Sequence, residues 1–517
     1  MKAKIYSILL AAASVFGYTS CDSLDLVPES SIVDSGYWQD ADQFNAFHTG
    51  ISSYLRDQSY SLYVLGELRS NIFNGVPFGG EATQGVENVY YNTLSAVNPG
   101  VSNYGNFYNI INQINLMIAK AEETTLITEA NKNYYLGESY GLRAYLYFHL
   151  LRSYGDVILY TDYTSGTTLD LSNLNRTQDS AETVMAQIKS DIASSEAAFG
   201  SDYAFTKGKN FWSLGATKML KGEVYLWSGK QMGGGTSDYQ TALQALQEVK
   251  NCPNIALLDS YKDVFSFSKK RNNEVIYAIY NGENEKAMFN GSWRGNFVPQ
   301  QAYMNSGAYY TESGENVKET SDSQLNGLVR APLDLELYDD LYLDNDPRKR
   351  INLRSVYKAD AEGNIAYVGA YPYKYQGTML AGGSERQWYD DFIIYRYADC
   401  LLLMAEAKAL LGQDITEEIN AVRKRAYGEN YSDAVAYPND KGEFYVDNKF
   451  VGGDDDPVEA VLKERLREMI FEGRRWYDIR LFNMTGKYSL ATSDKLLWPI
   501  NTSTLTNNNQ LKQTPGY

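Results

Sequence analysis

Residues Tyr134 to Tyr160 read YYLGESYGLRAYLYFHLLRSYGDVILY, and this stretch predicts the main structural element of the chain. Its apolar residues recur every three or four positions, which places them on one face of a helix of about four turns. These residues are Leu136, Tyr140, Ala144, Tyr147, Phe148 and Leu151. Gly155-Asp156 ends the helix, and the apolar residues that follow are expected to be extended. The spacing therefore favours an α-helical scaffold.

The same stretch contains Gly137-Glu138-Ser139-Tyr140-Gly141, which matches the G-x-S-x-G string of serine hydrolases. That string needs its serine on a sharp turn after a strand, whereas Ser139 falls early in the predicted helix. The order serine, acid, histidine also fails, because His48 precedes Ser139 and His149 lies downstream on the same helix. We interpret Ser139 as a helix residue and not as a nucleophile.

Further helical patterns lie on both sides of this stretch. Gly222, Tyr225, Tyr239 and Ala242 stand where a tetratricopeptide helix pair has the small and aromatic residues that let two helices cross closely. The predicted helices cover residues 42–55, 104–123, 213–226, 239–249, 395–411 and 415–426, and a last helix begins after the Asp454-Asp455-Asp456-Pro457 cap. We expect an all-α fold built on tetratricopeptide-like helix pairs.

Two segments lack helical periodicity. Residues 67–100 and 260–391 are rich in Gly, Asn, Ser and Tyr, with short β-like runs such as Val275–Tyr280. Loops on a helical scaffold are where binding groups usually lie. We expect a single domain made of an N-terminal helical part at 21–259, a loop-rich insertion at 260–391 and a C-terminal helical part at 392–517.

The first residues have the pattern of a bacterial export signal. Lys2 and Lys4 precede a short apolar run, and small residues then lead to Cys21. This apolar run is shorter than a membrane-spanning helix, which needs about 20 residues. Tyr18-Thr19-Ser20-Cys21 resembles a lipobox, although Tyr18 stands where Leu is usual. We predict a signal peptide at 1–20 and lipidation of Cys21; an ordinary cleaved signal is the alternative.

Charge and composition restrict the function. The net charge is −17, so a polyanion would be repelled and nucleic acid is not an expected partner. The 44 tyrosines outnumber the 41 glycines and offer rings that suit both helix packing and sugar stacking. The two histidines give no zinc pattern, and the runs at Asp344–Asp346 and Asp454–Asp456 lack the Gly and Glu of a calcium loop. We expect no metal and no cofactor.

Short strings in a fixed order carry a resemblance to a known family. They are Leu142-Arg143-Ala144, Tyr154-Gly155-Asp156, Tyr395–Asp399, Ala405-Glu406-Ala407, Ile419–Arg423, Glu464-Arg465, Glu472–Arg475, Leu497–Ile500 and Gln513–Tyr517. With the lipobox, they resemble the SusD/RagB family of Bacteroidetes outer-membrane lipoproteins. The resemblance runs nearly end to end. It implies about four tetratricopeptide-like units with loop insertions, and a lid on a TonB-dependent SusC-like transporter that captures oligosaccharides or, in some members, peptides. It implies no catalysis.

The charged residues of these strings are interpreted as scaffold ion pairs. Arg396, Asp399 and Glu406 fall in a predicted helix that is otherwise rich in Leu and Met, so we expect them to be paired. The charged residues between Glu464 and Arg475 recur at spacings of three and four, which favours pairing along one helix.

Candidate ligand contacts are flat rings with amide and charged hydrogen-bonding groups beside them. A first set, Arg69 and Asn71 with Tyr90 and Tyr91, lies where starch-binding members of the family place ligand contacts. A second set comprises Trp293, Arg294, Asn296, Tyr303, Tyr309 and Tyr310, and Trp388 is a further candidate. Packing within the loops is an equally good interpretation of any one of these residues.

We therefore hypothesise a surface lipoprotein of the outer membrane that binds oligosaccharide and partners a SusC-like transporter. A peptide-binding relative with the same fold is the first alternative. A surface glycan hydrolase is the second. It would need two carboxylates about 5–10 Å apart, and no local pattern among the 64 acidic residues selects such a pair.

Overall fold

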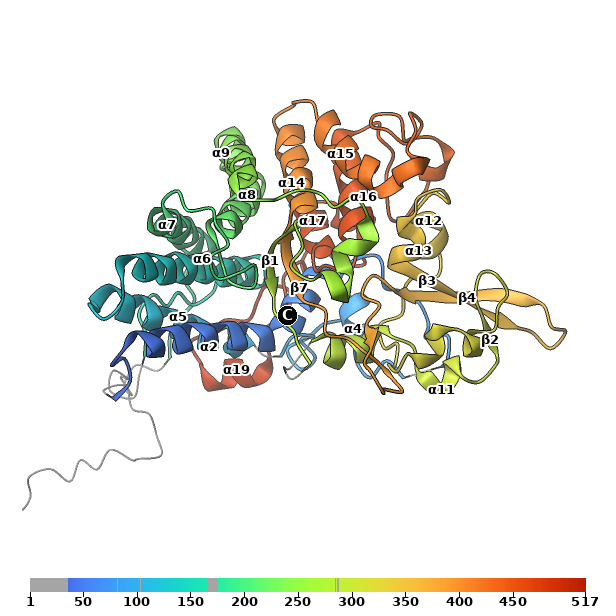
Figure 1. Cartoon of the computed structure of the whole chain (residues 1–517), viewed down its shortest axis with the longest axis horizontal. Helices are drawn as coiled ribbons and strands as arrows, with labels where there is room; N and C mark the ends of the chain where they lie inside the picture. Colours follow the sequence, from blue (N-terminus) through green and yellow to red (C-terminus); the bar gives the residue numbers. More distant parts are fainter. Residues whose placement is uncertain (1–35, 81, 103, 165–174, 284, 286–287) are drawn as a thin grey trace, which may run out of the picture.

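The computed structural model describes residues 36–80, 82–102, 104–164, 175–283, 285 and 288–517. Helices dominate this part of the chain and its strands are short, which confirms the predicted fold class. In Figure 1, helices α5 to α9 follow one another on one side, and α14 to α16 continue beside them. The predicted signal peptide and Cys21 lie outside the described residues. No helix within those residues has the length and apolar character to cross a membrane.

The quoted stretch forms the long helix α6 (Glu129–Tyr154), as its periodicity predicts. Thr128 caps the first turn by accepting a hydrogen bond from the Asn131 amide, and Gly155 ends the helix with a φ of 78°. Val157 then pairs with Asp179 through an isolated β-bridge. Ser139 is buried within the helix, so its hydroxyl does not stand on a strand-to-helix turn.

The N-terminal helices pack as successive pairs. α6 contacts both α5 and α7, and α8 contacts α9. Gly222 lets α8 and α9 approach, because a Cβ there would lie 2.6 Å from Leu246. A Cβ at Gly229 would lie 2.5 Å from the Tyr239 ring. The helices here are α2 (Ala41–Asp57), α3 (Ser59–Glu67), α4 (Glu87–Tyr90), α5 (Tyr104–Glu123), α7 (Ala181–Phe199), α8 (Leu214–Gln231) and α9 (Gly235–Glu248).

Three of these helices, α3, α4 and α7, were not predicted, although α7 carries a readable signal. Ser180 caps it by accepting from the Thr183 amide, and Val184, Ile188 and Ile192 form a buried stripe. α3 is buried along almost its whole length and shows little periodicity. Its helical state is therefore decided by packing and not by its pattern.

The loop-rich part contains small sheets. β1 (Val275–Ile279) pairs antiparallel with β7 (Phe392–Arg396), so this sheet joins residues far apart in the sequence. β2 (Tyr309–Tyr310), β3 (Leu353–Ala359) and β4 (Ile365–Pro372) form an antiparallel sheet in that order, which lies at the far side of the molecule from α7 (Figure 1). β5 (Thr378–Met379) pairs with β6 (Arg386–Gln387). Short helices flank the sheets: α10 (Arg294–Phe297), α11 (Gln301–Met304), α12 (Leu337–Asp340) and α13 (Arg348–Asn352).

The predicted helix at 395–411 begins later than expected. Tyr395 and Arg396 belong to β7, and the helix α14 starts at Tyr397. The β-branched pair Ile393-Ile394 favours the strand, and pairing with β1 fixes it. The remaining helices are α14 (Tyr397–Leu410), α15 (Thr416–Tyr427), α16 (Pro457–Met469), α17 (Arg475–Leu481), α18 (Thr485–Tyr488) and α19 (Thr502–Asn507).

Buried ion pairs surround α16, whose N-terminus is capped by Asp456 as predicted. The expectation that its charges pair along the helix is wrong. Glu468 instead pairs with Arg396 of β7 at 2.7 Å and with Arg348 of α13 at 3.1 Å. Arg465 pairs with Asp399 of α14 at 3.1 Å. Because α16 is buried on all sides from Ala460 onward, its charged groups face other elements and not solvent.

The other charged residues and the C-terminal tail are held by different contacts. Arg396 also contacts Glu274 at 2.8 Å, whereas Glu406 lies 3.9 Å from Arg465 and neither of its oxygens has a hydrogen-bond partner among the described residues. Cys400 is a free, buried thiol. At the C-terminus the Tyr517 hydroxyl donates to the Leu497 carbonyl at 3.1 Å, so the tail is held against the body of the protein.

Candidate ligand-binding site

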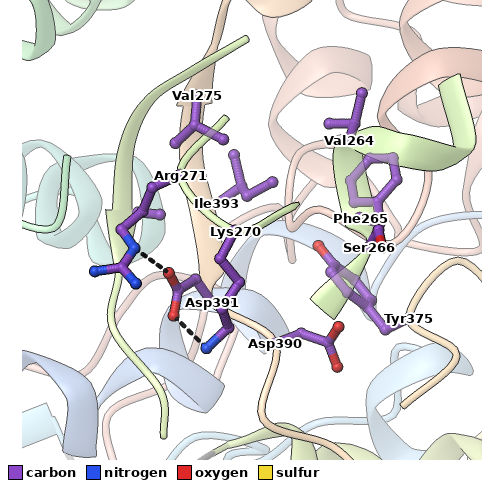
Figure 2. Close-up of a pocket in the computed structure, with 11 residues that line it drawn as sticks. Val264, Phe265, Ser266, Lys270, Arg271, Val275, Tyr375, Asp390, Asp391 and Ile393 are labelled. Atoms are coloured by element: carbon purple, nitrogen blue, oxygen red, sulfur yellow. Dashed lines mark ion pairs between the residues drawn. The ribbon is translucent and has the colours of Figure 1, made fainter. Parts of the chain in front are cut away.

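A hollow opens where β1, β7 and the segment before β1 meet. Its inner part, shown in Figure 2, lies between the β1–β7 sheet and the turn at 264–266. Its outer part continues toward the segment 374–378. We call the two parts together the central hollow. Both are bordered by Phe265, Ser266 and Asp390.

The two parts differ in what they can hold. The inner part has a volume of about 20 Å³, which is room for about one water molecule. The outer part has about 230 Å³ and is open to solvent. The outer part is lined by Lys262, Asp263, Phe265, Ser266, Phe267, Ser268, Lys374, Gln376, Gly377, Thr378 and Asp390. A ligand would therefore enter the outer part and reach the inner part only with a small group.

Asp391 belongs to the frame of the hollow. Lys270 lies 3.0 Å from its carboxylate and Arg271 lies 3.9 Å away, as the dashed lines of Figure 2 show. Its Oδ1 also accepts the Asn281 amide at 3.0 Å. Because these groups use both oxygens, Asp391 holds the segment before β1 against β7.

Asp390 is the acidic group that the frame leaves available. Its side chain is buried, and its Oδ2 has no hydrogen-bond partner among the described residues. Burial raises its pKa to about 7, although nearby Lys270 lowers it. A buried polar atom without a partner is unfavourable, so this oxygen is well suited to accept or donate a hydrogen bond to a ligand hydroxyl or a water molecule.

One aromatic ring of the outer part faces solvent. Phe267 is 39% exposed, and the Lys270 ammonium lies 5.3 Å from its ring centroid. Lys374 lies in the floor and is buried, with its ammonium 2.7 Å from Glu472. Burial lowers the pKa of Lys374 to about 8, against the charge of Glu472. The outer part thus combines a flat apolar face with hydroxyl, amide and charged groups.

The predicted tryptophans stand behind this hollow and do not face solvent. Trp293 is buried, and its ring lies 5.7 Å from the ring of Tyr375, which lines the inner part. Trp388 is also buried, and its Nε1 donates to the Tyr375 carbonyl at 3.1 Å. The expectation that these two rings project toward a ligand is corrected: they support the wall that Tyr375 forms.

Arg69 is likewise corrected to a structural position. Its side chain is fully buried, its Nε donates to the Asn92 Oδ1 at 2.7 Å, and its Nη1 donates to the Leu497 carbonyl at 2.6 Å. The guanidinium lies 4.5 Å from the ring centroid of Trp476. Asn71 is half-buried and donates to the Lys449 carbonyl at 2.7 Å. These bonds hold the segment 67–100 against the C-terminal part of the chain.

The structure brings the two predicted loop regions together, although not through rings exposed to solvent. Phe73 forms a β-bridge with Leu333, and the Phe78 ring lies 5.8 Å from that of Tyr309. Tyr309 is buried, and its hydroxyl donates to the Phe78 carbonyl at 3.3 Å. Asn296 is buried as well, with its Nδ2 donating to the Ser292 carbonyl at 2.8 Å.

The remaining candidates differ in exposure. Tyr90 is buried and packs edge-on against Tyr91, whose ring is exposed. Arg294, Tyr303 and Tyr310 are half-buried. These four side chains, Tyr91, Arg294, Tyr303 and Tyr310, and the half-buried Asn71 therefore stay predictions as ligand contacts.

The residues that line the central hollow were not predicted from the sequence. The run Tyr261–Arg271 alternates aromatic, serine and basic residues, which is a readable signal for a polar surface with one ring. The pair Asp390-Asp391 gave no such signal, because its two members differ only in their tertiary surroundings. No cluster of three or more potential ligands for a metal ion occurs among the described residues. Asp346 and Asp454 are instead paired with Arg348 and Arg423.

The described residues form a frame of helix pairs with a polar hollow that is open to solvent. The profile of the SusD family matches residues 262–489. A SusD superfamily protein from Bacteroides vulgatus is 53% identical, with a TM-score of 0.89 over 93% of this chain and 100% of that chain. B. fragilis NanU is also 53% identical, with a TM-score of 0.91 over 95% of this chain and 99% of that chain. This chain belongs to the SusD family.

A more distant structure shares the fold. It is a laminarin-binding SusD-like protein, 21% identical, with a TM-score of 0.70 over 93% of this chain and 100% of that chain. At this identity the similarity concerns the arrangement of the elements and not the residues of a site.

Proposed function

We propose that this chain is a cell-surface binding lipoprotein that captures a glycan and delivers it to a TonB-dependent SusC-like transporter of the outer membrane. Family membership supports the class of protein, since SusD-like relatives include a laminarin-binding protein. In this proposal the transporter and the glycan are the partners, and the lipid on Cys21 is the anchor.

The observation that carries the proposal is the outer part of the central hollow. Sugars present apolar faces that stack on aromatic rings and hydroxyls that both donate and accept hydrogen bonds. Phe267 supplies an accessible ring, and Ser266, Gln376 and Thr378 supply neutral hydrogen-bonding groups beside it. Asp390 supplies an acidic oxygen that its own surroundings leave available. We place one sugar residue of the ligand here.

Binding without catalysis is the better-supported reading of this geometry. A glycosidase needs two free carboxylates across the sugar. Of the acids that line the hollow, Asp391 is held by Lys270 and the Asn281 amide, and Asp263 pairs with Lys269 at 2.6 Å. Asp390 is therefore the one acid of this lining that forms no ion pair among the described residues. A peptide-binding relative with the same fold stays the alternative, and the binding assay separates the two.

The test is calorimetry with a panel of neutral hexasaccharides, laminarihexaose, maltohexaose and cellohexaose, against a pool of peptides. Phe267→Ala should weaken binding of the best hexasaccharide by roughly 5- to 150-fold, which corresponds to about 1–3 kcal/mol for the loss of an aromatic contact. Tyr54→Ala is the matched control, since Tyr54 is an exposed ring on α2 outside the hollow. Binding of peptides alone would refute the glycan proposal.

The anchor has its own test. Replacement of Cys21 by Ala should move the full-length protein from the membrane fraction to the soluble fraction of cells that express it. The protein with Cys21 intact is the reference. A variant that stays in the membrane fraction would contradict lipidation at this position.

A further inference from the structure

A second hollow lies on the sheet formed by β2, β3 and β4, apart from the central hollow. It has a volume of about 430 Å³, which is larger than the outer part of the central hollow. Its lining comes from the turn after β2, the segment 320–322, α12, α13 and the start of β3. Its charged lining residues are Glu312, Glu315, Asp322, Arg350 and Arg354, and Tyr338 lies beside them. We call it the sheet hollow.

A two-bonded ion pair stands at the rim of the sheet hollow. The Nε of Arg350 donates to the Glu312 Oε2 at 3.0 Å, and its Nη2 donates to Oε1 at 2.9 Å. The Tyr338 hydroxyl donates to the same carboxylate at 3.1 Å. The side chains of Arg350 and Glu312 are 51% and 40% exposed, so the pair is fixed in place and still open to solvent.

A second guanidinium–carboxylate pair lies deeper in the same hollow. Arg354 is 3.0 Å from Asp322, and its guanidinium lies 4.1 Å from the ring centroid of Tyr373. The Tyr373 hydroxyl donates to the Asp322 Oδ1 at 3.3 Å. Glu312 and Asp322 therefore each lie against one arginine and one tyrosine, and Glu315 is the third acid of the hollow.

This arrangement matches the chemistry of a neutral sugar. Neighbouring hydroxyls of a sugar donate and accept hydrogen bonds at once, and a fixed arginine beside a fixed carboxylate offers donors and acceptors in one plane. Exposed ion pairs contribute about 0–1 kcal/mol to stability. The folding stability of the protein therefore gives little reason for the fixed geometry of the Arg350–Glu312 pair. Glu312 and Asp322 balance the two arginines, and Glu315 adds one further negative charge, so the hollow disfavours an anionic ligand and suits a neutral one.

The sheet hollow and the central hollow lie on two sides of one segment. Tyr373 contacts Asp322 in the sheet hollow, whereas Tyr375 lines the central hollow. Arg386 bridges the two, because it donates to the Gln376 carbonyl at 2.9 Å and to the Ser321 carbonyl at 3.2 Å. Gln376 lines one hollow and Ser321 lines the other.

We propose that the sheet hollow is a second binding site for a neutral sugar residue, read by the Arg350–Glu312 pair. The class of ligand is inferred from the proposed function. The site itself is inferred independently, because the sheet hollow is a separate surface with its own polar groups. Two sites on one rigid frame raise the avidity for a long chain, because the second contact forms within the complex.

The experiment compares variants of the full chain by calorimetry with the hexasaccharide of the panel that binds the wild type most tightly, and with the polysaccharide of the same linkage. Arg350→Met and Glu312→Gln should each weaken binding of the polysaccharide by about tenfold or more, with the melting temperature changed by no more than a few degrees. Lys441→Met is the matched control, since it removes an exposed ion pair with Asp455 outside both hollows.

The outcomes separate the two proposals. Reduced polysaccharide binding in both sheet-hollow variants, with Lys441→Met unchanged, supports the second site. Wild-type binding in both variants overturns the second site and leaves the proposed function standing if Phe267→Ala still weakens binding. A wild type that binds no member of the panel overturns both.

Discussion

Replacement of Arg396 by Met should destabilise the protein by about 3–5 kcal/mol, the scale for removing one partner of a buried ion pair. The guanidinium is fully buried and contacts Glu274 at 2.8 Å, Glu468 at 2.7 Å and Glu472 at 2.8 Å. Each of these acids keeps another cation, since Arg425 faces Glu274 and Glu468 and Lys374 faces Glu472. The loss should therefore stay within this range and not reach the sum of three unpaired charges.

The expected change in melting temperature follows from the size of the chain. An unfolding entropy of about 2.1 cal/mol/K per residue gives about 1 kcal/mol/K here, so the melting temperature should fall by roughly 3–5 °C. Circular dichroism at pH 7 measures it. Arg350→Met is the control, because it removes an arginine from an exposed pair and should change stability by about 1 kcal/mol or less.

The pH dependence gives a second signature. Burial raises the pKa of Glu468, but the guanidiniums of Arg425, Arg396 and Arg348 lower it to about 2. A carboxyl with a lowered folded-state pKa stabilises the protein above its unfolded value of about 4.5, and this stabilisation is lost as the pH falls toward 2. The difference in free energy of unfolding between wild type and Arg396→Met should therefore have its full value at pH 6 and should become smaller below pH 4.5. Equal stability of the two proteins at pH 6 would refute the reasoning.

Two further perturbations test the frame. Gly141→Ala should lower the free energy of unfolding by about 1–3 kcal/mol or more, because its Cβ would lie 2.1 Å from Nε1 of the buried Trp212. Gly50→Ala on α2 is the control: its Cβ meets nothing within 4 Å, so the substitution should be neutral or stabilising. Thermal melts compare the two variants, and equal melting temperatures would contradict the predicted clash. Glu406→Gln should flatten the pH dependence of stability between about pH 4.5 and 8, because burial raises the folded-state pKa of Glu406 to about 8 and the wild type loses stability as the pH rises through that window. Parallel wild-type and Glu406→Gln curves across this range would contradict it.

Local chemistry in the sequence was enough to predict the helical frame. The stripe from Leu136 to Leu151 and the glycine at 155 specify α6 without reference to the rest of the chain, because spacing and caps act within a few residues. The same holds for the Asp456 cap of α16. The order of the short strings that resemble the SusD/RagB family indicated the class of protein.

The positions of the candidate rings depended on contacts that no local pattern encodes. Trp293 and Phe267 are both aromatic residues of a loop-rich segment, yet one is buried behind Tyr375 and the other faces solvent. Asp390 and Asp391 are chain neighbours, yet Lys270 and the Asn281 amide hold only Asp391. Likewise Arg396 was predicted in a helix and stands at the end of a strand, facing acids from other elements.

The sequence by itself determined most of the helices and their caps, because these depend on interactions between near neighbours in the chain, and the order of the short strings along it indicated the class of protein. Packing decided α3 and the strand at Tyr395-Arg396. Only the tertiary structure decided which rings and carboxyls are left for a ligand. Burial and charge pairing are set by segments far apart in the sequence, such as 264–279 and 390–396, which meet at the central hollow. No spacing within either segment indicates that they meet.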